Sequence, residues 1–388
     1  MAKSSIVSSV LLVLELLFVV SYAQNVKICK TPRNQEGECK LITKCQSLFS
    51  ILQNRPITSE GADFLRQSHC GFEGSLPKVC CPLKTDVGTT QAPTVDYGTA
   101  RPADSSLLPS TEDCGIGSTA DRIYGGNATD LDEFPWMALI EYERERGRSG
   151  FYCGGVLINK RYILTAAHCV KGKDLPRSWK LSSVRLGEYN TETDSDCVSL
   201  QNGKQRCAPP PVNVLVEEAI AHEQYNPYDV NQYNDIALLR LAREVKYTGF
   251  VRPICLPKTS LDQSRDYTGT KLTVSGWGKT EKRSESNIKL KLDVPVKTNS
   301  DCSRTYRQAG VTVNNGQLCA GGEKGKDSCR GDSGGPLMKL SPDAEYQLNW
   351  FVIGVVSFGP SPCGMEGWPG VYTKVANYVP WIVSKLRP

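Results

Sequence analysis

A serine flanked by glycines is the most reactive arrangement in this chain. Residues 331–335 read Gly-Asp-Ser-Gly-Gly, and the carboxylate of Asp327 lies six residues before Ser333. A serine hydroxyl is a weak nucleophile, so it needs a base, a group that orients the base, and N–H donors for the oxyanion. Glycines allow the tight turn that places such donors near a substrate carbonyl. Taken alone, the same turn is also compatible with an ordinary loop.

Two upstream residues could complete this chemistry. His168 ends one apolar stretch, and Asp235 begins another. The chain holds only three histidines, and the other two, His69 and His222, lack such a context, so we expect them to be surface or packing residues. The chain order His168, Asp235, Ser333 is one of those in which a base, an orienting acid and a nucleophile recur.

Further motifs appear in a fixed order around these residues. They are Cys153-Gly154-Gly155, Gly276-Trp277-Gly278, Ser357-Phe358-Gly359, Pro369-Gly370-Val371-Tyr372 and Trp381-Ile382. From Ile123 to its end, the chain therefore resembles the trypsin/chymotrypsin family of serine proteases. The resemblance implies that Ser333 attacks, that His168 is the base, and that Asp235 orients it with help from Ser357. The amides of Gly331 and Ser333 then form the oxyanion hole. The alternative is an inactive homologue, although all three catalytic residues are present.

The resemblance implies an all-β fold with two six-stranded antiparallel barrels, the catalytic residues between them, and a C-terminal helix. Short apolar and alternating runs separated by Gly and Pro turns, from Ile123 to Thr373, are typical of such strands. Helical spacing over Tyr378–Leu386 predicts the closing helix.

Asp327 predicts the substrate preference. A carboxylate at the base of a pocket selects Arg or Lys before the scissile bond, because a buried charge without a partner is costly. Gly359 and Gly370 match the family's pocket walls, where side chains would block a long basic residue. Phe358 departs from the tryptophan that the family often carries, which leaves preferences beyond the first residue open.

The segment Arg122-Ile123-Tyr124-Gly125-Gly126 predicts a zymogen. Cleavage after Arg122 would free the α-amine of Ile123, which in the resembled family pairs with the carboxylate beside the nucleophile, here Asp332. The pocket and the oxyanion hole would then order only after cleavage. A constitutively active enzyme is the alternative.

Composition divides the 388 residues into several parts. Residues 1–23 read as a secretory signal peptide rather than a membrane anchor, since the apolar run is short and interrupted by Glu15. Residues 82–113, rich in Thr, Pro, Ser, Gly and Asp, predict a flexible linker. Residues 114–122 would end the pro-segment, and 123–388 would form the protease domain. The net charge of +5 is modest, and no Lys/Arg run points to nucleic acid.

Sixteen cysteines indicate an oxidising compartment and a disulfide framework. Six of them lie in residues 29–81, a region too small to fold without such bonds. Their spacing resembles the clip domain of arthropod protease zymogens, and another small knotted module is the alternative. The two resemblances together imply the pairs Cys29–Cys80, Cys39–Cys70, Cys45–Cys81, Cys114–Cys255, Cys153–Cys169, Cys302–Cys319 and Cys329–Cys363. Cys197 and Cys207 would close a short hairpin, which leaves no free thiol.

Two further sites are hypotheses. Residues 187–196 concentrate oxygen donors, which suits Ca²⁺, and their start resembles the family's calcium loop. The expected ligands are Glu188, Asn190, Thr193 and Asp196, with Glu192 and Asp194 as substitutes. A solvated acidic loop is the alternative. Asn127 begins a glycosylation sequon that could also stay unused.

These features predict a secreted serine endopeptidase zymogen that is activated after Arg122 and cuts proteins after Arg or Lys. The resemblance implies a role in an extracellular cascade, either prophenoloxidase activation or processing of a Toll ligand. Expected partners are a downstream zymogen or cytokine precursor, an upstream activating protease and a serpin inhibitor, with no nucleic acid and no membrane span. The alternatives are a non-catalytic clip-domain cofactor, a developmental-patterning protease and a digestive trypsin.

Overall fold

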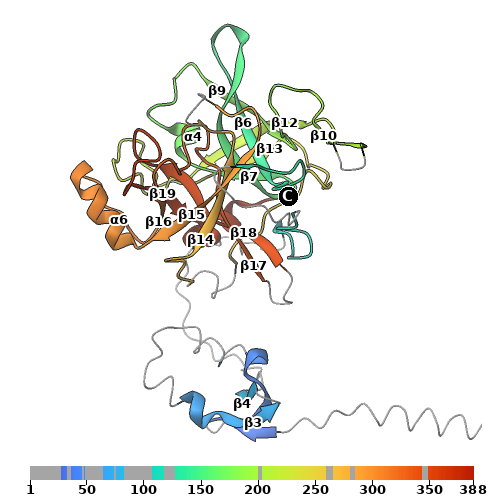
Figure 1. Cartoon of the computed structure of the whole chain (residues 1–388), viewed down its shortest axis with the longest axis vertical. Coiled ribbons are helices and arrows are strands. Elements are labelled where there is room, and N and C mark those ends of the chain that lie inside the picture. Colours follow the sequence, from blue (N-terminus) through green and yellow to red (C-terminus); the bar gives the residue numbers. More distant parts are fainter. Residues whose placement is uncertain are drawn as a thin grey trace, which may run out of the picture. The chain divides into compact units, whose positions relative to one another are not determined.

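The computed structural model describes residues 28–32, 36–45, 48, 64–73, 76–82, 107–117, 127–199, 203–258, 265–279, 285–342 and 348–388. The chain divides into two compact units, Met1–Gly98 and Thr99–Pro388. The predicted signal peptide and both residues of the predicted cleavage site, Arg122 and Ile123, lie outside the described residues. Figure 1 shows the chain with its elements labelled.

The N-terminal unit contains a small antiparallel sheet with the strand order β1-β2-β4-β3. Its elements are β1 (Ile28–Lys30), β2 (Glu36–Leu41), the 3₁₀ helix η1 (Ile42–Lys44), β3 (His69–Glu73) and β4 (Leu76–Pro82). Its buried apolar cluster holds few residues, among them Ile42, Leu48 and Val79. Three disulfides, Cys29–Cys80, Cys39–Cys70 and Cys45–Cys81, join the pairs that the clip resemblance implies. So small a core depends on such cross-links for stability.

Six strands of the second unit form a closed barrel in the order β12-β13-β8-β7-β6-β9. They are β6 (Met137–Glu143), β7 (Ser149–Asn159), β8 (Tyr162–Thr165), β9 (Lys180–Leu186), β12 (Val212–Ala221) and β13 (Ala237–Leu241). β8 and β13 are buried along their whole length, which explains their continuous apolar sequences. A separate hairpin of β10 (Cys197–Ser199) and β11 (Gln205–Cys207) is closed by the predicted Cys197–Cys207 disulfide.

A second set of six strands closes through the additional β14–β15 pairing, in the order β14-β17-β18-β19-β16-β15. They are β14 (Lys271–Gly276), β15 (Leu290–Lys297), β16 (Gln317–Gly321), β17 (Pro336–Pro342), β18 (Leu348–Phe358) and β19 (Pro369–Lys374). The short strand β5 (Asn127–Ala128) pairs with β15 at Leu290 and Lys291. The predicted pair of six-stranded barrels is therefore present, and Figure 1 shows the strands of each barrel grouped together.

Among the described residues of the second unit, the helices are few and short. They are α4 (His168–Lys171), α6 (Asn299–Tyr306) and α7 (Val379–Lys385), with the 3₁₀ helices η3 (Glu145–Gly147), η4 (Arg307–Ala309) and η5 (Val375–Tyr378). The predicted C-terminal helix corresponds to η5 and α7, and α7 buries Val379 and Ile382. Among the described residues, no helix is long and apolar enough to cross a membrane.

The predicted linker over residues 82–113 is wrong at its C-terminal end. Leu108 is buried in the same cluster of apolar side chains as residues of the first barrel, such as Ile158 and Tyr162. The side chain of Asn159 donates to the carbonyl of Leu107 at 3.0 Å, and Asn349 donates to that of Cys114 at 2.8 Å. Apolar side chains and satisfied backbone carbonyls hold residues 107–113 on the catalytic unit. The Cys114–Cys255 disulfide adds a covalent link.

The remaining disulfides of the catalytic unit also match the expected pairs. They are Cys153–Cys169, Cys302–Cys319 and Cys329–Cys363. All sixteen cysteines of the chain are thus paired, and none is free.

Candidate active site

His168 and Asp235 meet where two paired strands of the first barrel lie side by side. Thr165 at the end of β8 pairs with Ala237 at the start of β13, so the residues just outside both strands are neighbours. The Asp235 carboxylate accepts the backbone N–H of His168 at 2.8 Å and lies 2.7 Å from its Nδ1. These two contacts fix the orientation of the ring and leave Nε2 available to take a proton.

The second barrel supplies the other partners of Asp235. The hydroxyl of Ser357 donates to Oδ2 at 2.5 Å, as the resemblance implies for this position. The hydroxyl of Thr373 donates to the backbone carbonyl of Asp235 at 2.7 Å. Asp235 is fully buried, so its negative charge depends on these donors for stability. Thr373 is a supporting residue that sequence reasoning missed, because only the fold brings β19 to Asp235.

The surroundings of His168 favour its charged form. Burial lowers the pKa of the imidazole, but the charge of Asp235 and its hydrogen bond raise it by more, so the net pKa lies above its usual value. The side chain keeps 19% of its surface exposed, enough for contact with a substrate. A protonated His168 would thus be stabilised by the Asp235 carboxylate.

Ser333 lies on a turn that contacts the first barrel. Its carbonyl accepts the N–H of Gly154 at 2.8 Å, next to the Cys153–Cys169 disulfide that also holds the residue after His168. Gly334 has a φ of +77°, and a Cβ there would overlap Thr165 Oγ1, so this position requires glycine. The turn thus connects the serine to the region that carries the histidine.

The amides expected to form the oxyanion hole are those of Gly331 and Ser333. Within the part of the chain that the structure describes, neither amide donates to an acceptor. Gly331 has a φ of +98°, a conformation that other residues rarely adopt. Both N–H groups remain available to a substrate oxyanion, which is what such a site needs.

Asp327 lies between the two predicted pocket glycines. A Cβ added to Gly370 would lie 3.0 Å from Asp327 Oδ1, and one added to Gly359 would lie 3.7 Å from Oδ2. Oδ1 is buried and has no hydrogen-bond partner among the described residues. Burial raises the pKa of this carboxyl to about 7, although the amides of Gly364 and Ser328 act in the opposite direction. A cationic side chain is the partner that this group lacks.

Asp332 is a second carboxylate that lacks a cation. Its Oδ1 accepts the N–H of Gly278 at 2.8 Å, and its Oδ2 accepts that of Cys329 at 3.0 Å. Burial raises its pKa to about 6 despite these two amides. Asp327 and Asp332 line one cavity of about 830 Å³. No cationic side chain among the described residues forms an ion pair with Asp332.

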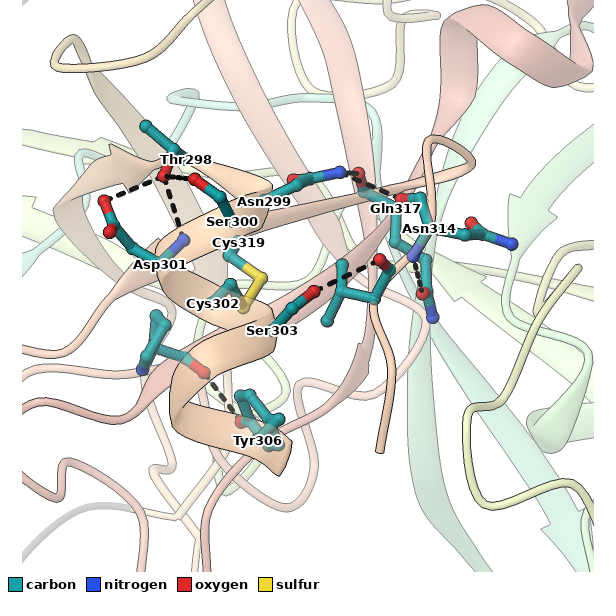
Figure 2. The surroundings of a disulfide bond; sticks show 12 residues. Thr298, Asn299, Ser300, Asp301, Cys302, Ser303, Tyr306, Asn314, Gln317 and Cys319 are labelled. Carbon is teal, nitrogen blue, oxygen red and sulfur yellow. Dashed lines mark hydrogen bonds between the residues drawn. A yellow bond between two sulfur atoms is a disulfide. The ribbon is translucent and has the colours of Figure 1, made fainter. Parts of the chain in front are cut away.

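Helix α6 carries Tyr306 near its C-terminal end, and Figure 2 shows this helix around the Cys302–Cys319 disulfide. Thr298 caps the helix by accepting the N–H of Asp301. The hydroxyl of Tyr306 donates to the carbonyl of Pro369 at 2.7 Å, next to Gly370. Its ring lies 5.7 Å from that of Phe358 and 5.2 Å from that of Trp368. Phe358 therefore takes part in an edge-to-face aromatic group although it replaces the tryptophan common in the family.

The predicted calcium ligands come from one turn. Asp196 accepts the backbone N–H of Asn190 at 3.0 Å and the hydroxyl of Thr193. The Glu188 carboxylate, which is buried, pairs with Arg185 at 3.1 Å. Glu192 and Asp194, the substitutes, are exposed. One other cluster, Cys153, His168 and Cys169, has metal-type ligand atoms close together, but its two sulfurs are joined in a disulfide.

The remaining predicted residues lie outside the site. His222 stacks against Trp381, with ring centroids 5.0 Å apart, and His69 contacts Phe72 in the N-terminal unit. The backbone of Asn127 belongs to β5, and its sequon stays a prediction.

Comparison with family models gives two matches. The model described as Trypsin matches residues 123–382. The model described as Regulatory CLIP domain of proteinases matches residues 29–81.

Similar proteins cover nearly the whole chain. The CLIP domain-containing serine protease HP8 of Bombyx mori is 48% identical, over 91% of this chain and 92% of the relative. Phenoloxidase-activating enzyme 1 of Spodoptera litura is 44% identical, over 92% of this chain and 93% of the relative. Among solved structures, the Drosophila Grass clip serine protease of the Toll pathway matches with a TM-score of 0.64 and 35% identity. That match covers 93% of this chain and 97% of the other.

Proposed function

Since the chain belongs to the clip-domain serine proteases of the trypsin family, we propose that it is a secreted zymogen that, once activated, cuts proteins after Arg or Lys. The observation that carries the specificity is the Asp327 carboxylate, whose Oδ1 is buried without a partner between the two pocket glycines. An Arg or Lys side chain would supply the missing charge. A neutral side chain would leave the buried oxygen unpaired, which is costly.

The mechanism follows from the contacts of the catalytic residues. Ser333 Oγ attacks the scissile carbonyl while His168 Nε2 takes its proton, and Asp235 stabilises the resulting imidazolium through the 2.7 Å contact with Nδ1. The amides of Gly331 and Ser333 donate to the oxyanion. His168 then returns the proton to the leaving amine, and water repeats the sequence on the acyl-enzyme.

Activation uses the other unpaired carboxylate. Cleavage after Arg122 would produce an α-ammonium group on Ile123, and Asp332 is the partly buried anion that this group would neutralise. The two amides that hold Asp332 come from Gly278 and Cys329, on segments that line the same cavity as Asp327. An ion pair at Asp332 would therefore stabilise the arrangement of the pocket.

The cascade role rests on the relatives. Two of them are named as a phenoloxidase-activating enzyme and a phenoloxidase-activating factor, and the solved relative is described as a protease of the Toll pathway. We place this chain in the same kind of extracellular cascade, with an upstream protease, a downstream zymogen or cytokine precursor and a serpin as partners. The eight disulfides support an oxidising, secretory route. The non-catalytic cofactor is disfavoured, because Ser333, His168 and Asp235 are all present.

One assay tests the proposal. The purified chain is cleaved after Arg122 and offered chromogenic anilides that end in Arg, Lys or Phe. We expect hydrolysis of the Arg and Lys anilides, loss of activity with a fluorophosphonate, and none in Ser333→Ala. An Arg122→Gln chain treated in the same way should stay inactive. Preference for the Phe anilide would contradict the role of Asp327, and full activity of the Arg122→Gln chain would contradict the zymogen.

We also propose that residues 188–196 hold structural Ca²⁺. The donor set fits, because it consists only of oxygen ligands and gathers Asn190, Thr193 and Asp196 in one turn. Glu188 would have to share its carboxylate with Arg185, which lies 3.1 Å away. When bound, the ion would stabilise this turn and take no part in the reaction.

A chelator tests the calcium proposal. We expect EDTA to lower the melting temperature by about 4 °C or less, the shift that about 1 kcal/mol produces in a domain of this size. Added Ca²⁺ should restore it. Asp196→Asn should remove the response, and Asp194→Asn, an exposed neighbour, should keep it. An unchanged melting temperature in the unaltered protein would refute the site.

A further inference from the structure

Two loops of the first barrel carry an excess of positive charge close to His168. Residues 143–149 connect β6 to β7, and residues 171–180 connect the end of α4 to the start of β9. Together these basic loops contain seven Lys and Arg residues against three Asp and Glu, a net charge of +4. The whole chain has a net charge of only +5, so most of its excess lies here.

Most of these cations are free to meet a partner. Among the described residues, five of them are exposed and form neither an ion pair nor a cation–π contact: Arg146, Arg148, Lys173, Arg177 and Lys180. Lysine and arginine side chains on a folded surface often pair with neighbouring acids, yet Glu143, Glu145 and Asp174 do not neutralise these five. The surface is therefore available to an anionic ligand.

The basic loops are held in place by aromatic packing. Tyr152 and Trp179 form an edge-to-face pair with centroids 5.4 Å apart. The guanidinium of Arg144 lies 4.1 Å from the Trp179 ring and also donates to the carbonyl of Phe151 at 3.2 Å. β6 and β9 bring Glu143 opposite Lys180, so the two loops share one edge of the barrel. Charges on such a fixed base cost little to order when a partner binds.

The position of the basic loops relative to Ser333 indicates which part of a substrate they meet. The pocket at Asp327 belongs to the second barrel and takes the residue before the scissile bond. On the other side, Ser333 contacts Gly154 of β7, and Tyr142 of β6 donates to the carbonyl of Cys169 at 2.7 Å. The strands that carry these contacts lead directly into the basic loops. A substrate whose Arg or Lys occupies the pocket at Asp327 and whose next peptide bond lies at Ser333 would therefore continue toward the first barrel and its basic loops.

The loop that leads to Asp235 has the opposite character. Residues 223–234 contain Glu223 and Asp229 and no Lys or Arg. Asn231 ties this loop to the second barrel, because its side chain accepts the N–H of Thr312 at 2.7 Å. Of these first-barrel loops, the basic loops therefore carry the excess of positive charge, and the loop that leads to Asp235 carries none.

We propose that the basic loops bind acidic side chains that follow the scissile bond in the protein substrate. This inference rests on the proposed function, since it assigns a further preference to the same cleavage reaction. Electrostatic attraction of this kind raises the association rate and is weakened by salt.

Paired substrates test the inference. Two internally quenched peptides share one sequence through Arg, and the residues after the cut carry either Asp and Glu or Asn and Gln. We expect the activated protein to prefer the acidic peptide by about tenfold in kcat/KM at low salt, as a few exposed ion pairs would give. The preference should shrink at about 0.5 M NaCl, where charges are strongly screened.

Matched variants identify the residues responsible. Arg146→Gln with Arg148→Gln, and separately Lys173→Gln with Arg177→Gln, should each reduce the preference by a few-fold. Hydrolysis of an arginyl anilide, which has no peptide residues after the cut, should not change. The control pair Lys271→Gln with Lys297→Gln removes the same charge from exposed positions of the second barrel and should leave the preference intact.

The outcomes separate this inference from the proposed function. No hydrolysis of the arginyl anilide would mean that the proposed function itself is wrong. Normal hydrolysis with equal rates on the two peptides would overturn the inference alone. Binding of heparin by the basic loops without any peptide preference would also overturn it, in favour of a polysaccharide surface.

Discussion

Asp235, which is fully buried, and Asp327, which has one buried oxygen, are both carboxylates of the candidate active site, but the protein surrounds them in opposite ways. Asp235 accepts from the backbone and ring of His168 and from Ser357, and its main-chain carbonyl accepts from Thr373. Asp327 has a buried oxygen without any partner in the described structure. Residues of both barrels satisfy the first group permanently, whereas the second is left for a ligand.

The difference reflects two kinds of function. A group that orients a base must hold the same geometry at every stage of the reaction, so its donors are built into the fold. A group that selects a substrate must lack a hydrogen-bonding or charged partner before binding, because only then does binding of the correct side chain lower the free energy. Asp332 also lacks a cationic partner in the described structure, and its expected partner is the α-ammonium group of Ile123. Such sites reduce the stability of the empty protein.

The largest effect is expected when Asp235, whose carboxylate has several hydrogen-bond donors, is altered. Asp235→Asn keeps the shape of the side chain but presents an amide to Nδ1, which favours the wrong tautomer of His168. We expect kcat on an arginyl anilide to fall by about 10⁴-fold. Ser357→Ala removes one donor and leaves the carboxylate, so its loss should be near tenfold. An Asp235→Asn protein with more than a tenth of normal activity would show that Asp235 is not the orienting group.

A smaller effect is expected when Asp327, which has a buried oxygen without a partner, is altered. Asp327→Ser removes the charge that pairs with an arginine side chain, which is worth about 3–5 kcal/mol when the pair is buried, or roughly 150- to 5,000-fold in kcat/KM. The Phe anilide should not lose activity. Ser328→Ala, which keeps the carboxylate, is the matched control. Equal losses on the Arg and Phe anilides would indicate general damage rather than lost selection.

The pH dependence of kcat, which His168 should control, should differ from that of KM, which Asp327 should control. Catalysis needs neutral His168, so kcat should fall as the pH drops through an imidazole pKa above its usual value. Binding of arginine needs ionised Asp327, whose pKa is about 7 in the empty pocket, so KM should rise below about that pH. Measurement of kcat and KM from pH 5 to 9 separates these effects. A KM for the Phe anilide with the same pH dependence would argue against Asp327.

The smallest effect concerns stability. The pKa of Asp327 is raised by burial, so the folded chain binds a proton more tightly than the unfolded chain. Its contribution to stability is therefore present at acidic pH and is lost as the pH rises from about 4 to about 7. In an uncleaved Ser333→Ala background, Asp327→Asn should add about 1–2 kcal/mol to the free energy of unfolding at pH 8.

Denaturant titrations at pH 5 and pH 8 measure this difference. The gain should be small at pH 5 and larger at pH 8, because only the ionised carboxylate is penalised. Glu323→Gln, an exposed acid in an ion pair with Lys326, serves as a control and should show no such gain. A gain of equal size at both pH values would point to a cause other than charge burial.

Much of the candidate site was predictable because most of its residues belong to short sequence motifs. The order of His168, Asp235 and Ser333, the carboxylate at Asp327 and the family resemblance together predicted the candidate catalytic residues, and the resemblance also implied the disulfide pairs. The supporting residues were not predictable in this way. Thr373 and Gly278 act through a hydroxyl and an amide that any sequence contains, and only the packing of distant strands gives them a role.

The amino-acid sequence by itself determined which reactive side chains the protein contains, which cysteines are available for disulfide bonds and which bond an activating protease could cleave. Only the tertiary structure decided which groups are satisfied and which are left without a partner. It also decided that residues 107–113 belong to the catalytic unit and that two loops of modest charge share one edge of a barrel. Hydrogen bonding, burial and charge density depend on distances between residues far apart in the chain, and folding alone sets those distances.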